Sequence, residues 1–130
     1  SARAISVSIT VGTALPFLAS AQGKLWLSEL DVISRESYLK HPIAGGTLSG
    51  DDLQKLNADL IKITRQGFAT NLGENEPDIA AISVPVRDQN GRMILSLSTF
   101  GPLGRFNENF CRIAKEKLEL GAQEIGQLLI

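Results

Sequence analysis

The chain has 130 residues, of which 43% are hydrophobic and 21% charged, and its 13 basic and 14 acidic side chains give a formal net charge of −1. This length and composition are typical of a single globular domain, and the balanced charge argues against nucleic-acid binding by this chain alone. The single cysteine, Cys111, excludes an internal disulfide and a cysteine metal cluster, and the apolar runs are too short to cross a membrane, so we expect a cytoplasmic protein.

The first predicted elements are a strand and a helix. Apolar and small polar residues alternate over residues 4–11, which predicts a half-buried strand. Ser20 then predicts the N-cap of a helix that runs to about Leu30. Gly23, early in this helix, indicates that a strand or a ligand approaches the backbone closely. The first N–H groups of this helix have no carbonyl partner within it. They could bind an anion, or they could bond only to the capping residue, and both interpretations stay open.

Two more helical segments follow. We expect a short helical turn over Ser34–Leu39 that closes before Pro42, and then a loop that includes His41 and extends to Gly46. The longest helix begins after Ser49 with two acidic residues and is stopped by Gly67. Its expected apolar stripe consists of Leu53, Leu56, Leu60, Ile61 and Ile63.

A short strand over Phe68–Leu72 leads to the most informative part of the chain, a predicted hairpin. Its strands are Ile79–Val86 and Met93–Phe100, and the connection between them contains Asn90-Gly91, the strongest short-range hairpin signal. Apolar residues occur on both faces of these strands. This pattern predicts a hairpin central to a sheet, covered by helices on one side and by a pocket or a partner on the other. A final helix is expected after Asn107 or Asn109.

Polar residues in and beside the hairpin have two interpretations each. Ser96 and Ser98 lie two positions apart and therefore on one face of their strand. They either bond to nearby backbone and water or line a small polar cavity. Glu74, Glu76 and Asp78 similarly form either a solvated turn or a ligand-facing loop.

The residues of an enzyme are missing from the sequence. His41 is the single histidine, and no serine or cysteine lies in the context of an activated nucleophile. Histidine, cysteine and carboxylate residues do not cluster at the spacing of metal ligands. We therefore expect no catalytic residue, no metal site and no cofactor.

The ordered set of motifs resembles the effector-binding domain of the IclR family of bacterial transcriptional regulators over about residues 10–130. The motifs that carry this resemblance are Gly12-Thr13-Ala14-Leu15-Pro16, Ala19-Ser20-Ala21-Gln22-Gly23-Lys24, Leu60 to Ala69, Gly73-Glu74, Ile79 to Val86, Asp88 with Gly91, and Ser96-Leu97-Ser98-Thr99-Phe100-Gly101-Pro102 with Arg105.

This resemblance implies an α+β, GAF/profilin-like domain in which helices flank a curved antiparallel sheet. Residues 1–130 would form a single effector-binding domain that is incomplete on its N-terminal side, and the family's winged helix-turn-helix lies outside this chain. The implied partners are a small carboxylate or aromatic effector, further copies in a dimer or tetramer, and DNA through the absent domain. No membrane is implied. The effector would contact Ala21, Gln22, Gly23, Glu74, Asn75, Asp78, Pro85, Ser98 and Phe100.

The sequence departs from the family near Pro77-Asp78, where many relatives carry a glycine and an apolar residue. Phe100 stands where relatives that bind small oxoacids carry a hydroxyl, which favours a larger or aromatic effector or a reduced cavity. Two functions remain open on the sequence, an effector sensor and an oligomerisation module with a vestigial pocket. The third, a small enzyme, has no support in the spacing of reactive residues.

Overall fold

The computed structural model of the chain describes residues 18–129, so the strand predicted over 4–11 lies outside the described residues. Three helices come first, α1 (Ala21–Glu29), α2 (Val32–Ala44) and α3 (Gly50–Gln66). Three strands follow, β1 (Ala69–Leu72), β2 (Ile79–Arg87) and β3 (Met93–Pro102), and then a 3-10 turn (Leu103–Arg105) and the helix α4 (Glu108–Gly126). The α+β class expected from the sequence is confirmed.

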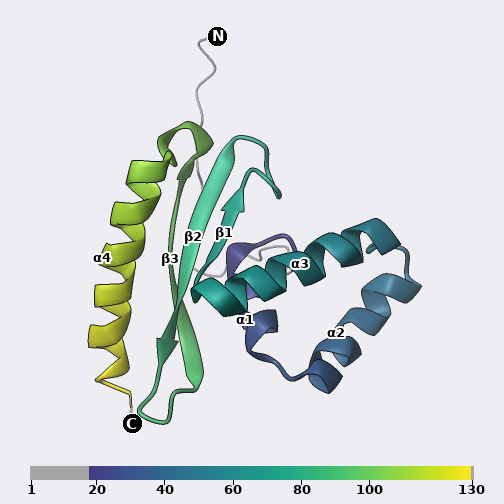
Figure 1. The fold of residues 1–130 in the computed structure, drawn as a ribbon, viewed down its shortest axis with the longest axis horizontal. Coiled ribbons are helices and arrows are strands. Elements are labelled where there is room, and N and C mark those ends of the chain that lie inside the picture. Colours follow the sequence, from purple (N-terminus) through teal and green to yellow (C-terminus); the bar gives the residue numbers. More distant parts are fainter. Residues whose placement is uncertain (1–17, 130) are drawn as a thin grey trace.

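Within the described residues the strands form one antiparallel sheet in the order β1-β2-β3. Helix α4 packs on one face of this sheet, and α1 and α3 lie on the other (Figure 1). The predicted hairpin is confirmed, and β2 is its central strand because it pairs with both neighbours. The connection is closed by the Asp88 side chain, which accepts hydrogen bonds from the N–H groups of Asn90 and Arg92. Gly91 provides the positive φ, 80°, that this turn needs.

Each face of β2 contributes to a different part of the core. On the α4 side, Ile82, Val84 and Val86 are almost completely buried, which stabilises the fold by about 1.5–3 kcal/mol for each side chain. On the opposite side, Ala81 packs with the cluster under α1 and α3, whose buried members include Leu25 and Leu60. The expectation that both faces of the hairpin are covered is therefore correct for β2. At the turn end of β3, the described residues leave Ile94 and Leu95 exposed.

The structure corrects the prediction for α2. The helix is capped by Asp31, whose carboxylate accepts from the Ser34 N–H at 2.7 Å, so it begins before the predicted turn. It also continues through His41 and Pro42 to Ala44, where a loop was expected. Pro42 has no N–H to donate to the carbonyl four residues earlier, so α2 lacks one hydrogen bond there, and only two helical residues follow it.

Helix α3 has the predicted beginning and end. Ser49 and Asp52 form a reciprocal capping box, and Gly67 ends the helix in the left-handed conformation with φ of 83°. Leu56, Leu60 and Ile63 of the predicted stripe are buried. The prediction is wrong for Ile61, whose exposed fraction is 61%. Ile61 lies about 100° around the helix from Leu60, which turns it away from the core.

The capping carboxylate of Asp52 predicts a dependence of stability on pH. Hydrogen bonds from Ser49 lower the pKa of this carboxyl. A lowered pKa in the folded state contributes stability above the unfolded pKa, and this contribution is lost as the pH falls below about 4. Asp52→Ala should therefore destabilise the domain at pH 7 and much less at pH 3, as measured by urea unfolding. Asp51→Ala, in the same helical turn without the capping bond, is the control, and an equal loss in both variants would contradict the prediction.

Close packing of α4 against β2 gives a second prediction. A Cβ atom added at Gly126 would lie 2.5 Å from the carbonyl oxygen of Arg87, a backbone atom that cannot move independently. Gly126→Ala should lower the free energy of unfolding by about 1–3 kcal/mol, measured by thermal or urea unfolding.

Gly121→Ala is the matched control for this substitution on the same helix. Its Cβ would meet the end of the Leu97 side chain at 3.1 Å, and that side chain can rotate away. Alanine also favours a helix over glycine by about 0.5–1 kcal/mol, so the control should be nearly neutral. Equal destabilisation by the two substitutions would refute the packing argument.

Candidate functional site

The start of α1 is fixed in position by its own cap and by β1. The Ser20 hydroxyl accepts a hydrogen bond from the Gly23 N–H at 3.0 Å, as the sequence predicted for a capped helix. The amide nitrogen of Asn71, on β1, donates to the Ala19 carbonyl just before the helix. At the other end, Arg35 donates to the carbonyls of Leu27 and Leu30 and so caps the C-terminus of α1. The N-terminal turn is therefore held in one place relative to the sheet.

A buried ion pair adds to this attachment. Lys24 has an exposed fraction of only 2%, and its Nζ lies 2.8 Å from Oε2 of Glu74 and 3.5 Å from Oδ2 of Asp59. The pair joins α1 to the loop between β1 and β2 and to α3. The other side chain that orders this loop is Asn71, whose Oδ1 accepts from the Glu74 N–H at 2.8 Å. Glu74 is therefore held by α1 instead of pointing freely into solvent.

The first turn of α1 and β3 together wall a cleft of about 330 Å³. Ser20, Gln22 and Gly23 line it from the helix start, and Trp26 lines it one turn later. The strand side of this α1–β3 cleft consists of Met93, Ile94, Leu95 and Ser96. The wall thus combines first-turn N–H groups and hydroxyls with an indole, a thioether and aliphatic groups, and it carries no charged side chain among the described residues.

The two strand serines that the sequence singled out have different surroundings. Ser96 lines the α1–β3 cleft. Ser98 lies opposite Ser83 in the register of the hairpin and donates to its hydroxyl at 2.8 Å, and Ser83 is fully buried. Ser96 is thus exposed at the cleft, whereas Ser98 bonds to a side-chain hydroxyl, a partner that neither alternative named. Phe100, further along the same face of β3, is partly buried against the core cluster under α1 and α3.

A second cavity, of about 600 Å³, lies between α1, α2 and α3. Its lining is mixed. The charged residues are Lys24, Asp52, Lys55, Asp59 and Glu74, and apolar residues such as Leu48 and Leu56 lie between them. Tyr38 of α2 also borders it and packs edge to face against Trp26, with 4.7 Å between ring centroids. The first turn of α1 therefore separates two cavities, and the Lys24 ion pair belongs to the larger one.

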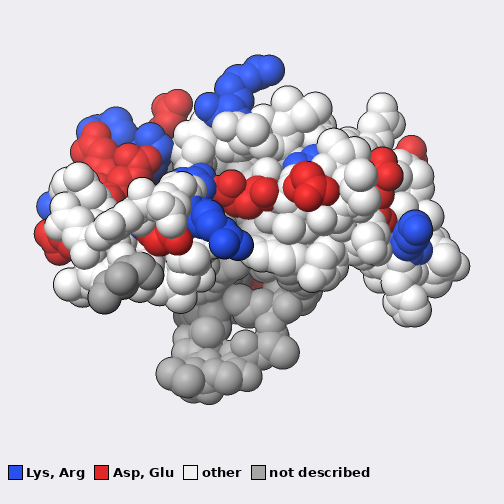
Figure 2. All heavy atoms as spheres, turned by 90° about the horizontal axis from the view of Figure 1, so that it is seen from below, with Lys and Arg blue, Asp and Glu red and all other residues white. Residues whose placement is uncertain are grey.

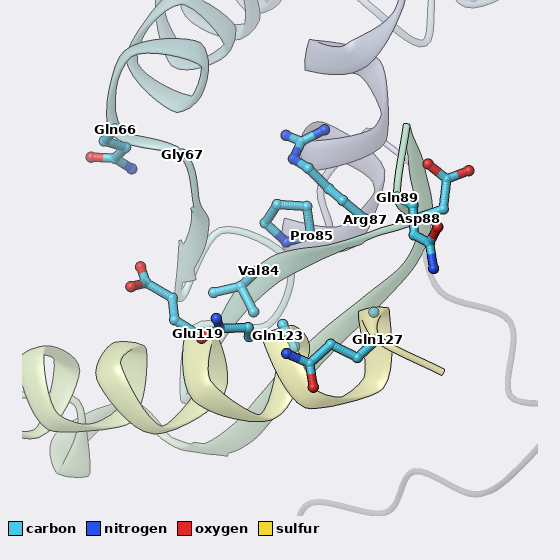
Figure 3. Close-up of a pocket in the computed structure, with 12 residues that line it drawn as sticks. Gln66, Gly67, Val84, Pro85, Arg87, Asp88, Gln89, Glu119, Gln123 and Gln127 are labelled. Atoms are coloured by element: carbon cyan, nitrogen blue, oxygen red, sulfur yellow. The ribbon is translucent and has the colours of Figure 1, made fainter. Parts of the chain in front are cut away.

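A third cavity, of about 610 Å³, opens at the part of β2 that β1 does not cover (Figure 3). Figure 3 shows Val84 and Pro85 between the Gln66 end of α3 and the side chains of Gln123 and Gln127 on α4. Arg87 borders the cavity and forms an ion pair with Glu29 at the end of α1.

The nine residues predicted to contact an effector are thus distributed over several places. Gln22 and Gly23 line the α1–β3 cleft, Glu74 lines the cavity between the helices, and Pro85 lines the one at the edge of β2. Ala21 is fully buried at the helix start, Asn75 is exposed, and the Asp78 carbonyl accepts from the Leu103 N–H. The structure adds Trp26 and Met93 to the cleft. Helical spacing from Gln22 to Trp26 could have indicated the first, but strand pairing in three dimensions was needed for the second.

Other reactive groups are isolated. His41 is exposed near the end of α2. Burial raises the pKa of the Cys111 thiol, which lowers its reactivity at neutral pH. Within residues 18–129, histidine, cysteine and carboxylate side chains form no group able to hold a metal ion, and none of the described helices is long and apolar enough to cross a membrane. On the face drawn in Figure 2, acidic and basic side chains lie next to one another.

The sheet, with helices on its two faces and a cleft at the start of α1, defines a domain of the α+β class. Residues 1–127 match the family model described as bacterial transcriptional regulator IclR C-terminal. The chain therefore belongs to the IclR family, in its C-terminal domain. The resemblance inferred from the sequence is confirmed, and the family is one of transcriptional regulators and not of enzymes.

Individual relatives agree with this assignment. The Pca regulon regulatory protein of Pseudomonas putida is 29% identical over 105 residues, which cover 79% of this chain and 36% of the relative. A transcriptional regulator from Rhodococcus sp. RHA1 superposes with a TM-score of 0.80 at 23% identity, over 97% of this chain and 53% of that chain. The PobR inducer-binding domain from Acinetobacter, a double mutant in complex with 3-hydroxybenzoic acid, gives a TM-score of 0.75 at 22% identity, over 99% and 75% of the two chains. This chain thus spans about a third of the curated relative's length.

The buried ion pair predicts an effect of Glu74 on stability. Glu74→Gln removes the nearer of the two negative charges beside the Lys24 ammonium and leaves that buried cation with only the more distant Asp59. The free energy of unfolding should fall by about 1–3 kcal/mol, measured by urea unfolding at neutral pH. Glu76→Gln changes an exposed residue of the same loop and should be neutral. If both variants are as stable as the parent, the ion pair contributes nothing to the fold.

Proposed function

We propose that this domain is the effector sensor of an IclR-type regulator and that it binds a small organic acid, with aromatic acids favoured, in the α1–β3 cleft. The observation that carries the proposal is that the N-terminal turn of α1 and a strand hydroxyl, Ser96, share one cleft with Trp26 and Met93. N–H groups of a first helical turn have no carbonyl partner within the helix, and the helix dipole is positive there. A carboxylate is the ligand that such a site favours.

The remaining wall of the cleft suits an apolar or aromatic body. Trp26 and Met93 provide polarisable surface, and the volume of about 330 Å³ is at the small end of ligand pockets. The 3-hydroxybenzoic acid in the PobR complex supports this choice, since that domain has the same fold. Of the other predicted contacts, Gly23 lines the same cleft, and Ser98 and Phe100 would be reached by an effector that extends along β3.

The regulatory consequence is part of the same proposal. A winged helix-turn-helix outside this chain would bind the operator, and effector binding would alter operator affinity if the effector discriminates between two arrangements of the domains. Self-association would place several such domains in one assembly. Exposed apolar residues of α2, Val32 and Ile33, support an interface of this kind.

The proposal predicts stabilisation of the domain by acids. Benzoate and 3-hydroxybenzoate should raise the melting temperature, because a ligand that binds only the folded state stabilises it. Ser96→Ala should weaken binding about 10- to 100-fold, the effect of losing a hydrogen bond to a charged group. Thr99→Val, on the opposite face of β3, should bind as the parent does.

Calorimetric titration with the same two acids gives the affinities. If neither acid binds the parent domain and no other carboxylate of a broader panel does, the sensor function is refuted and an oligomerisation module with a vestigial pocket takes its place. If binding occurs and Ser96→Ala has no effect, the effector lies outside the α1–β3 cleft.

A further inference from the structure

We infer that helix α2 is a self-association surface, at which two copies of this chain pair antiparallel across a two-fold axis. The inference rests on the self-association included in the proposed function, names the surface that makes it, and does not require a bound effector. It begins from the place of α2 in the fold. Figure 1 shows this helix at the periphery of the molecule, away from the sheet, and within residues 32–44 only Leu39 is buried.

Three contacts determine which side of α2 faces the rest of the chain. Arg35 donates to two carbonyls at the end of α1, and Tyr38 packs edge to face on Trp26. Leu39 belongs to the core cluster under α1 and α3. Positions 35, 38 and 39 follow one another at helical spacing, so these contacts all lie on one side of the helix. The opposite side of α2 therefore faces outward.

The outward side of α2 has an ordered set of four exposed residues, two apolar ones with an acid and a base between them, namely Ile33, Glu36, Lys40 and Ile43. At about 100° per residue, these side chains fall within an arc of about 80°. The exposed fraction of Ile33 is 82%, and Val32 beside it is also exposed. Neither Glu36 nor Lys40 forms an ion pair with another described residue. This face thus has both apolar and charged groups available to a partner.

The order of the four residues is self-complementary. Their spacing is the same when read from either end of the helix. Two antiparallel copies of α2 can therefore place Ile33 beside the partner's Ile43 and, in the same register, Glu36 beside the partner's Lys40. A parallel pair would instead place each charge beside its own copy, and like charges repel. Charge complementarity therefore favours a second copy of this chain in the antiparallel orientation.

The size of the surface determines how strong this association can be. A helix of 13 residues is about 20 Å long, so one of its faces buries less than the roughly 1,200–2,000 Å² of a stable interface. We therefore expect a weak dimer that forms at high concentration. In an assembly held together by domains outside this chain, the same contact would be favoured by its high effective concentration.

Sedimentation velocity of the 130-residue chain, from about 10 μM to 1 mM, tests the contact. The parent should show a monomer–dimer equilibrium. Glu36→Lys and Lys40→Glu should each weaken the dimer about tenfold or more, because each substitution creates two like-charged pairs across the axis. The double variant with both substitutions exchanges the signs and recreates both ion pairs, so it should dimerise as the parent does.

Matched controls separate this contact from general effects of charge and of folding. Glu124→Lys and Lys117→Glu make the same charge changes at exposed positions of α4, and both should dimerise as the parent does. Ile33→Ser removes the apolar contact and should also weaken the dimer. Because Ile33 is so exposed, this variant should melt at the temperature of the parent when both are dilute. A loss of the dimer is then not a loss of the fold.

The other results each refute the inference. A parent chain that stays monomeric at about 1 mM assigns this face to another partner. A dimer that is insensitive to the two single charge variants has its interface elsewhere. If both single variants disrupt the dimer and the double variant does not restore it, α2 contacts a different surface of the second copy and the two-fold pairing is wrong. The samples contain no acid, so a failure of acids to bind would refute the sensor function and leave this contact intact.

Discussion

The arrangement of the domain depends on how β1 holds the beginning of α1. The buried Asn71 amide donates to the Ala19 carbonyl and accepts from the Glu74 N–H, so one side chain fixes both the entry to the helix and the loop that follows the strand. The Lys24 ion pair then joins the same turn to the same loop. Together with the buried Ala21, Leu25 and Leu27, these contacts set the position of α1 opposite β3 and so the shape of the cleft between them.

The two faces of the sheet have different roles because they are covered differently. Helix α4 lies along β2 with large aliphatic residues between them and with Gly126 against the Arg87 carbonyl, which leaves little room for movement. On the other face, the shorter helix α1 contacts β3, and the α1–β3 cleft lies between them. The face under α4 is closely packed, and the face under α1 keeps a cleft beside β3.

Much of the fold could be predicted because local signals agreed with the final structure. Ser49 with Asp52 and Gly67 fixed both ends of α3, and the apolar strands around Asn90-Gly91 fixed the hairpin. The failures have local physical causes as well. The Asp31 cap starts α2 before the predicted turn, and the helix continues for two residues past Pro42, where proline predicts a break.

The candidate site was less predictable than the fold, because it depends on contacts between distant residues. Of the predicted contacts, Gln22 and Gly23 line the cleft, but its strand side has Ser96 where Ser98 was expected. It could not show that Ser98 bonds to Ser83, or that Glu74 is held by Lys24, since these partners are 15 and 50 residues away. Whether a polar side chain has a hydrogen-bond partner depends on the tertiary structure. The sequence alone therefore does not separate a polar residue that is already bonded from one that is available to a ligand.

The proline at the uncovered part of β2 has a consequence for the behaviour of the domain in a crowded cell. Beyond Ser83 the strand has no β1 partner within the described residues, and such an edge can recruit a strand of another molecule. Pro85 interrupts the row of N–H donors along this strand, and the glutamines of α3 and α4 stand beside it. Intermolecular sheet extension is disfavoured at this edge, so the same residue that borders a cavity also protects the domain against aggregation.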